Sequence, residues 1–203
     1  MNIFWHGQTC FKITYQKGKD GLVNILIDPF DKETGLKPPK TNVDILINGS
    51  SNESETFLVD GPGEYDVKGA YIHGLAVPDK KDKGSVVYTI DVEGVRICHL
   101  GLLNQTEFSP GQLEEIGDVD ILLVPVGGGE AIDSKGAIKV MSQIEPKIII
   151  PMYYKVKGLK PKLEDVGAFL KALGIKSLPA VAKLSIKKKD ITQDEAKIIV
   201  LEP

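Results

Sequence analysis

Short apolar segments separated by turn residues fill the first hundred residues, and they restrict this part of the chain to a fold built from β-strands. Val43–Ile47 and Val95–His99 are typical, because each is short, apolar and followed within two residues by glycine. Runs of this length, rich in β-branched residues and bounded by turn residues, predict strands. The same pattern predicts strands over Asn2–His6, Phe11–Tyr15, Leu22–Asp28, Glu64–Val67, Ala70–Leu75 and Val86–Asp91. Glu93 and Gly94 predict a hairpin turn between Val86–Asp91 and Val95–His99.

Helical patterns begin only after Gly101. Ser109 followed by Pro110 marks the start of a short helix over Pro110–Ile116. Apolar residues at helical spacing predict further helices over Asp133–Ile144 and Leu163–Leu173. Strands are predicted over Asp120–Val126, Lys147–Ile150, Lys183–Ile186 and Lys197–Leu201. A β-rich half followed by alternating α and β predicts two sheets with helices outside them, in a single domain over residues 1–203.

Charge and composition exclude several kinds of partner. The net charge is −3 and the only arginine is Arg96, so nucleic acid is not an expected partner. The longest apolar runs, such as Ile121–Val126, are too short to cross a membrane, and no leader-type segment opens the chain. We therefore expect a cytoplasmic protein without a membrane partner. Its partners are otherwise unknown, and a homo-oligomer formed through an exposed edge strand stays open.

The histidines and cysteines form no recognisable catalytic or metal motif. His6, His73 and His99 lack the short spacings of zinc sites, and the last two are expected to be hydrogen-bonded strand residues. Cys10 could face His6, but no third residue marks an orienting group, so a core-filling cysteine is predicted. With Cys98 as the other cysteine, a disulfide framework and a Cys-only metal site are both excluded.

A glycine loop and a set of carboxylates offer two further kinds of site. The loop Gly127–Gly129 could cradle an anion, but it lacks the Gly-Lys-Ser/Thr of a phosphate loop and is followed by Glu130. Several acidic residues at strand ends and in loops could bind a hard cation, although solvated carboxylates are the expected role. They are Asp28, Asp31, Glu53, Asp60 and Glu64.

Six sequence blocks occur in one order along almost the whole chain: Trp5–Phe11, Ile27–Phe30, Gly61–Tyr65, Cys98–Gly101, Val124–Gly128 and Ile144–Met152. Together they resemble the metallo-β-lactamase fold superfamily, in particular its short bacterial and archaeal members called Zn-dependent hydrolases of the β-lactamase fold. The resemblance implies an α/β fold of the α+β kind. That fold is a four-layer αββα sandwich, with the active site at one edge between the sheets.

The resemblance also implies where metal ligands would lie, and this sequence departs from the family there. The family carries H-x-H-x-D-H after the strand that corresponds to Val43–Ile47. The corresponding ligand positions here, with those of two later motifs, are Gly49, Ser51, Glu53, Ser54, Leu102 and Tyr153. Only Glu53 is a conservative change, and the other side chains are poor or impossible zinc ligands. The sequence therefore predicts no metal and no cofactor, although zinc is expected in the family and these residues should converge.

The function predicted from the sequence follows from that loss. It is a metallo-β-lactamase-fold protein without metal ligands, acting by binding or assembly, with no assigned catalytic residue. Two alternatives stay open. One is a hydrolase with relocated or residual chemistry, drawing on Ser51, Glu53, Ser54 or Tyr153 with His6 or Gln8 at the rim. The other is binding of a small neutral or apolar ligand in the vestigial cleft.

Overall fold

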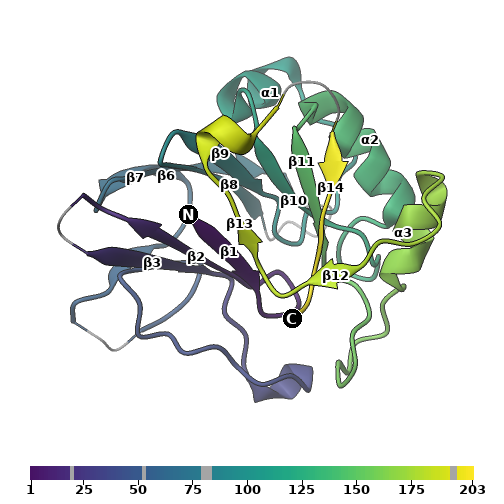
Figure 1. Ribbon diagram of the computed structural model, residues 1–203, viewed down its shortest axis with the longest axis horizontal. Coiled ribbons are helices and arrows are strands. Elements are labelled where there is room, and N and C mark those ends of the chain that lie inside the picture. Colours follow the sequence, from purple (N-terminus) through teal and green to yellow (C-terminus); the bar gives the residue numbers. More distant parts are fainter. Residues whose placement is uncertain (19–20, 52–53, 79–83, 193–195) are drawn as a thin grey trace.

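The computed structural model describes residues 1–18, 21–51, 54–78, 84–192 and 196–203, and its strands form two facing sheets (Figure 1). The first sheet has the order β13-β1-β2-β3-β4-β5. Its strands are β1 (Asn2–Trp5), β2 (Phe11–Gln16), β3 (Leu22–Ile27), β4 (Ile45–Ile47), β5 (Phe57–Val59) and β13 (Leu184–Ser185). The antiparallel pairs β1–β2 and β2–β3 are followed by the parallel pairs β3–β4 and β4–β5.

The second sheet has the order β14-β11-β10-β9-β8-β7-β6. Its strands are β6 (Gly63–Val67), β7 (Ala70–Val77), β8 (Ser85–Val92), β9 (Val95–His99), β10 (Ile121–Pro125), β11 (Ile148–Met152) and β14 (Lys197–Ile198). Strands β9, β10, β11 and β14 are parallel to one another. A separate small parallel pair joins β12 (Ala180–Val181) to β15 (Val200–Leu201).

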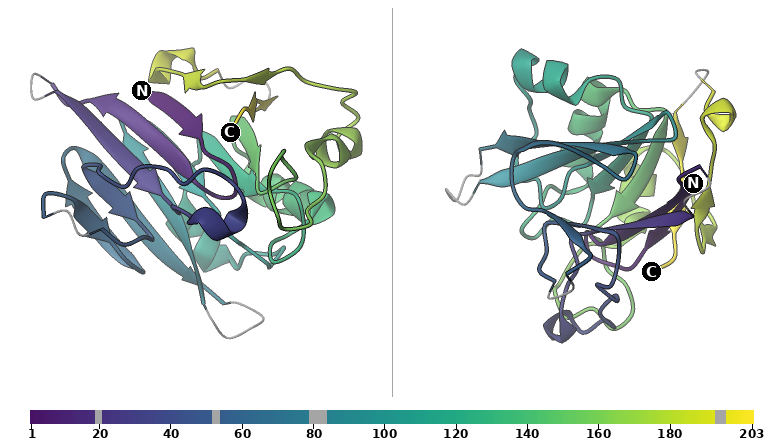
Figure 2. Two further views of the ribbon diagram at one scale, coloured as in Figure 1. Left: turned by 90° about the horizontal axis from the view of Figure 1, so that it is seen from below. Right: turned by 90° about the vertical axis from the view of Figure 1, so that its left-hand side faces the viewer.

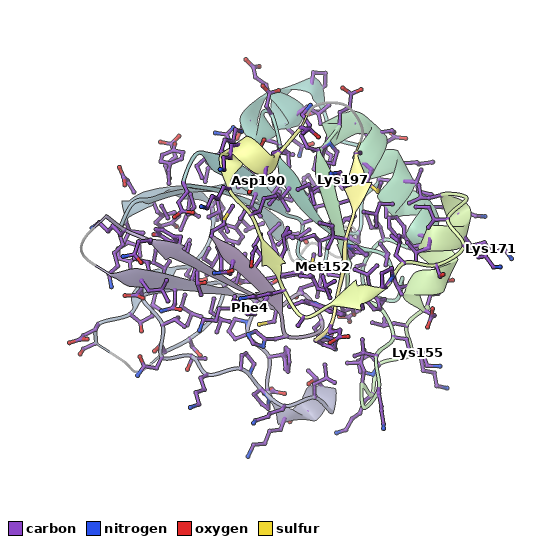
Figure 3. All side chains as sticks on the ribbon, in the orientation of Figure 1. Phe4, Met152, Lys155, Lys171, Asp190 and Lys197 are labelled. Carbon is purple, nitrogen blue, oxygen red and sulfur yellow. The ribbon has the colours of Figure 1, made fainter. Side chains whose placement is uncertain are left out.

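The helices are α1 (Pro110–Ile116), α2 (Ser134–Ile144) and α3 (Val166–Ala172). Helices α1 and α2 pack on the second sheet, and α3 packs on α2 (Figure 2). Their starts follow the sequence signals: Ser109 forms a capping box with Gln112, and the Asp133 side chain accepts from the Gly136 N–H. Met152 is fully buried, whereas Lys171 on α3 points outward (Figure 3).

The first sheet is apolar on both faces. Alternate residues of β3 and β4, such as Ile25 and Ile45, belong to the main core between the sheets. Their neighbours Leu26 and Leu46 point the other way and pack with Cys10, Val43 and Phe30 in a second, smaller cluster. The outer layer here is thus the segment 28–44, which contains the 3₁₀-helix η1 (Lys32–Thr34) and contributes Val43 and Phe30 to that cluster.

The predicted fold class is confirmed, with local corrections. The hairpin at Glu93 and Gly94 is present, and both residues have positive φ. Strand β11 runs through Pro151 instead of ending before it, because Pro151 still pairs in parallel with Val124 of β10. Strand β5 was missed, since two of its three residues are exposed and give no apolar alternation. The single-domain assignment stays a prediction. No helix in the described ranges is long and apolar enough to cross a membrane.

Helix α2 ends in a way that offers a stability test. Its C-cap residue, Glu145, has the left-handed values φ 51 and ψ 50. An L-residue with a Cβ is strained there, whereas glycine is not. We expect Glu145→Gly to raise the free energy of unfolding by about 1 kcal/mol, as measured by urea denaturation. Lys139→Gly, at an exposed helical position, should lower the free energy of unfolding by a similar amount. If both variants lose the same free energy of unfolding, the backbone at Glu145 is not strained.

Candidate functional site

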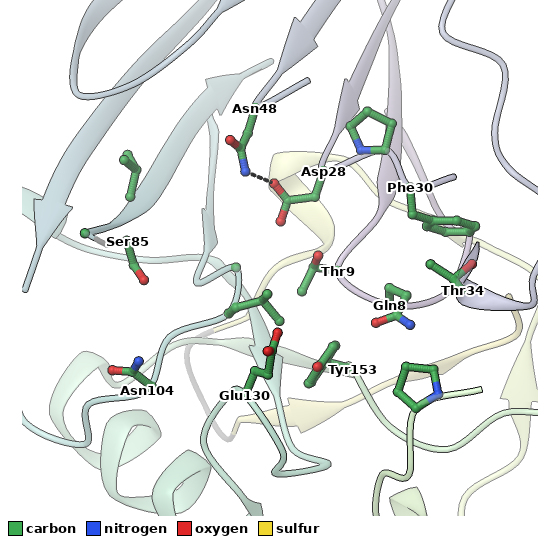
Figure 4. Close-up of a pocket in the computed structure, with 16 residues that line it drawn as sticks. Gln8, Thr9, Asp28, Phe30, Thr34, Asn48, Ser85, Asn104, Glu130 and Tyr153 are labelled. Atoms are coloured by element: carbon green, nitrogen blue, oxygen red, sulfur yellow. Dashed lines mark hydrogen bonds between the residues drawn. The ribbon is translucent and has the colours of Figure 1, made fainter. Parts of the chain in front are cut away.

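A pocket of about 600 Å³ opens where strands of both sheets end (Figure 4). Asp28 follows β3, Asn48 follows β4, and Tyr153 follows β11. Binding sites of parallel sheets gather at such carboxyl ends, since the connecting loops meet there. The lining residues are Gln8, Thr9, Asp28, Pro29, Phe30, Thr34, Asn48, Gly84, Ser85, Val86, Gly101, Leu102, Asn104, Glu130, Tyr153 and Pro161.

Backbone strain is concentrated in this pocket. Four of its non-glycine residues have left-handed φ values near 50°, namely Gln8, Asp28, Asn48 and Tyr153. Each such residue costs about 1–2 kcal/mol, although asparagine and aspartate tolerate the conformation better than others. Strain of this kind persists where surrounding structure holds it, and it gathers at functional sites.

The strained residues are held by bonds between separate strands. The Asp28 N–H donates to the Ile47 carbonyl at 3.1 Å, and the Asn48 N–H donates to the Val59 carbonyl at 2.9 Å. On the opposite side of the pocket, the Tyr153 N–H donates to the Gln8 carbonyl at 3.0 Å. The backbone at each strand end is therefore held by a hydrogen bond to a neighbouring segment. The side chains of Asp28, Asn48 and Tyr153 are directed into the pocket (Figure 4).

Asp28 is the most enclosed acidic residue of the lining, with a side chain 11% exposed. The Asn48 Nδ2 amide donates to its Oδ1 at 2.7 Å (Figure 4). Its Oδ2 would lie 3.7 Å from a Cβ added at Gly101, so the glycine leaves room beside this oxygen. The carboxylate is thus fixed through one oxygen, while the other faces the pocket.

His99 links two of the pocket loops and is itself fully buried. Its Nε2 lies 2.7 Å from the Thr9 carbonyl, and the Gly101 N–H donates to Nδ1 at 3.2 Å. This pattern assigns a neutral ring that carries its proton on Nε2. The prediction that His99 is a hydrogen-bonded strand residue is confirmed. Both ring nitrogens are engaged, although Nε2 also lies 3.8 Å from Asp28 Oδ2.

Tyr153 lines the pocket with its phenol side chain, although the residue is only 5% exposed. Burial raises the pKa of its hydroxyl, and the nearby Glu130 carboxylate raises it further. A hydrogen bond from the Glu130 backbone acts in the opposite direction without cancelling these effects. The phenol therefore keeps its proton at neutral pH and can donate a hydrogen bond to a bound molecule.

The residues predicted from the family motif have different places in the structure. Leu102 and Tyr153 line the pocket together. Gly49 lies just behind it, because a Cβ there would meet the side chain of the lining residue Pro29. Ser51 and Ser54 are not among the described lining residues, and Glu53 lies outside the described residues. Their correspondence to the family's ligand positions stays a prediction.

Sequence reasoning missed the importance of Asp28 and Asn48. Asp28 was treated as a solvated loop acid, and Asn48, the residue after the predicted strand Val43–Ile47, was given no role. One signal could have found them: each is a polar residue directly after a buried strand whose last residue is isoleucine. Ile27 and Ile47 are paired in register, so the two polar residues follow at matching positions.

The described donors do not complete a zinc centre. No group of three His, Cys, Asp or Glu side chains that could hold a metal ion occurs in the ranges that the structure describes. Cys10 is fully buried in the smaller cluster, and burial raises the pKa of its thiol. The prediction that it fills the core is confirmed. Structural zinc sites take four protein ligands and catalytic sites three, a number the described donors do not reach.

Comparison with known proteins gives a consistent group of relatives. The family model described as "Beta-lactamase superfamily domain" matches residues 2–153. A UPF0173 metal-dependent hydrolase of Archaeoglobus fulgidus is 33% identical, covering 88% of this chain and 93% of its own. Another, from Thermoplasma volcanium, is 27% identical and covers 76% and 83%. A crystal structure from Thermotoga maritima is 34% identical, with a TM-score of 0.77 and coverage of 99% and 98%. It is described as a candidate Zn-dependent hydrolase of the metallo-beta-lactamase superfamily.

Proposed function

This chain belongs to the beta-lactamase superfamily, and from that premise we propose that it is a hydrolase whose reaction takes place in the pocket at Asp28. The relatives named as metal-dependent hydrolases support this assignment. The observation that carries it is the Asp28–Asn48 pair, a carboxylate held by a 2.7 Å hydrogen bond among residues with strained backbones. The binding or assembly role predicted from the sequence has less support, because the relatives bear the names of hydrolases.

The prediction that no cofactor is involved is wrong. Relatives from Thermoplasma volcanium and Carboxydothermus hydrogenoformans are named metal-dependent hydrolases, and the Thermotoga maritima structure is described as Zn-dependent, which points to a metal cofactor. The prediction failed because it relied on the side chains at the motif positions and set aside the zinc that is expected in the family. The described donors around Asp28 do not complete a metal site, so the steps below use only this chain's residues.

Asp28 acts as the general base. A water molecule beside Oδ2 gives its proton to the carboxylate while its oxygen attacks the carbonyl carbon of an ester or amide. Asn48 keeps the carboxylate oriented, because its amide donates to the other oxygen, Oδ1. Since the carboxylate is largely enclosed, little rotation is left to it, and the base is held in place before the substrate arrives.

Tyr153 stabilises the charge that develops during the attack. The carbonyl oxygen becomes negative as the new carbon–oxygen bond forms, and the neutral phenol donates a hydrogen bond to it. When the intermediate collapses, the bond to the leaving group breaks and the leaving group takes the proton from Asp28. The carboxylate is thereby restored, and the products are a carboxylic acid and an alcohol or amine.

The proposal is tested by assaying the purified protein for release of 4-nitrophenol from a 4-nitrophenyl ester of a short fatty acid. Matched assays contain the chelated protein and the protein supplied with one equivalent of Zn²⁺. The expected result is release of 4-nitrophenol by an activity that copurifies with the protein and is inhibited by a competitive product analogue. If the protein does not exceed the rate of heat-denatured protein under either condition, the hydrolase proposal is overturned.

Tyr153→Phe removes the proposed hydrogen-bond donor and retains the ring. We expect kcat to fall about a hundredfold with little change in KM, since loss of one donor to an oxyanion has an effect of this size. Tyr65→Phe is the matched control, because this tyrosine lies on β6 and is not among the lining residues. A kcat of Tyr153→Phe within threefold of the control would show that the phenol does not stabilise the transition state.

A further inference from the structure

The charged side chains among the described lining residues are all of one sign. Among the lining residues in the described ranges, the only ionisable carboxyl groups are Asp28 and Glu130, and none is lysine, arginine or histidine. The other polar groups there are neutral amides and hydroxyls, which accept hydrogen bonds as readily as they donate them. A bound anion would therefore meet repulsion without a compensating positive side chain from this part of the chain.

The two carboxylates follow strands of different sheets, and both point into the pocket. Asp28 follows β3, and Glu130 lies in the loop after β10 (Figure 4). The charge of Glu130 extends into the pocket, because it contributes to the raised pKa of the buried Tyr153 hydroxyl. Glu130 is exposed and takes no part in the proposed reaction, so it is free to bind a second part of the substrate.

We infer that the substrate carries a positively charged group, an amine or guanidinium, which Glu130 binds while the scissile carbonyl lies at Asp28. This inference rests on the proposed hydrolase function and adds the class of substrate. The aromatic lining supports it, because the faces of Phe30 and Tyr153 also attract cations. It differs from the alternative left open by the sequence, a neutral or apolar ligand, which rested on the loss of charged residues at the family's ligand positions and gave no weight to Asp28 and Glu130.

The test compares three 4-nitrophenyl esters of similar length, with 6-aminohexanoate (cationic), heptanoate (neutral) and hemiadipate (anionic) as acyl groups, because these chains are too long to attack their own ester readily through a small ring. We expect kcat/KM of the cationic ester to exceed that of the neutral ester about tenfold, and the anionic ester to be the poorest. One exposed ion pair accounts for about fivefold of this preference, so Glu130→Gln should lower the cationic-to-neutral ratio by about that factor. The matched variant Glu114→Gln, an exposed carboxylate on α1, should leave the ratio unchanged.

Binding gives a second readout that does not depend on catalysis. In nuclear magnetic resonance titrations of the intact protein, n-butylammonium should shift signals of the pocket residues at lower concentration than n-butanol or n-butyrate. A neutral or anionic ester preferred over the cationic one overturns the inference while the hydrolase proposal stands. If no ester is hydrolysed, the hydrolase proposal fails, and stronger binding of butyrate than of butylammonium would still overturn the inference on charge.

Discussion

Asp28→Asn is expected to lower kcat/KM for ester hydrolysis about a thousandfold, because the amide cannot take a proton from water. The change keeps the size of the side chain, and the Asn48 amide can still donate to the Oδ1 of the new residue, as it does to Asp28. We therefore expect a folded protein with an unchanged pocket and an inactive base. The measurement is kcat/KM with the preferred ester, together with the thermal unfolding midpoint of each protein.

Asp66→Asn serves as the matched control, because Asp66 is an exposed carboxylate on β6 and does not line the pocket. Its activity should stay within a factor of two of the unchanged protein. If Asp28→Asn retains more than a third of the activity at normal stability, Asp28 is not the base. Equal losses in both variants would indicate a general effect of removing a negative charge, which the proposed mechanism does not allow.

Trp5→Ala should lower the free energy of unfolding by about 3–5 kcal/mol, the largest stability effect we expect from one substitution. Trp5 is 2% exposed, and its ring centroid lies 4.7 Å from that of Tyr154 and 6.5 Å from that of Phe11. Truncation would leave a cavity between β1 of the first sheet and the end of β11 in the second. Urea denaturation followed by circular dichroism measures the loss.

Trp5 also supports the pocket, since its indole Nε1–H donates to the Gln8 carbonyl at 3.0 Å. Trp5→Phe separates this bond from the packing, because it retains an aromatic ring and loses the donor. We expect it to cost about 1–2 kcal/mol, well below the alanine variant. The Gln8 carbonyl still accepts from the Tyr153 N–H, which limits the change. An alanine variant that loses less than 1 kcal/mol would show that the surrounding core closes over the gap.

Much of the fold could be predicted from the sequence because its signals are local. Strand β9 (Val95–His99) and helix α1 (Pro110–Ile116) were predicted to the residue, since a short apolar-rich segment between turn residues and a Ser-Pro start each act within a few positions. The family followed from motifs of this local kind. Strand β5, whose Phe57 and Leu58 are 41% and 44% exposed, was missed because only its pairing with β4 makes it a strand.

The pocket was decided by tertiary structure. Asp28 and Asn48 are separated by 20 positions, and they meet because β3 and β4 are paired in parallel with Ile27 beside Ile47. Tyr153 is held in the same space by the hydrogen bond from its N–H to the carbonyl of Gln8, which lies in the turn between β1 and β2 of the opposite sheet. The sequence by itself determined which segments are strands, since side-chain alternation and turn residues are local properties. Which polar residues share one pocket depends on strand order and register, and these minimise the free energy of the whole core rather than of any segment.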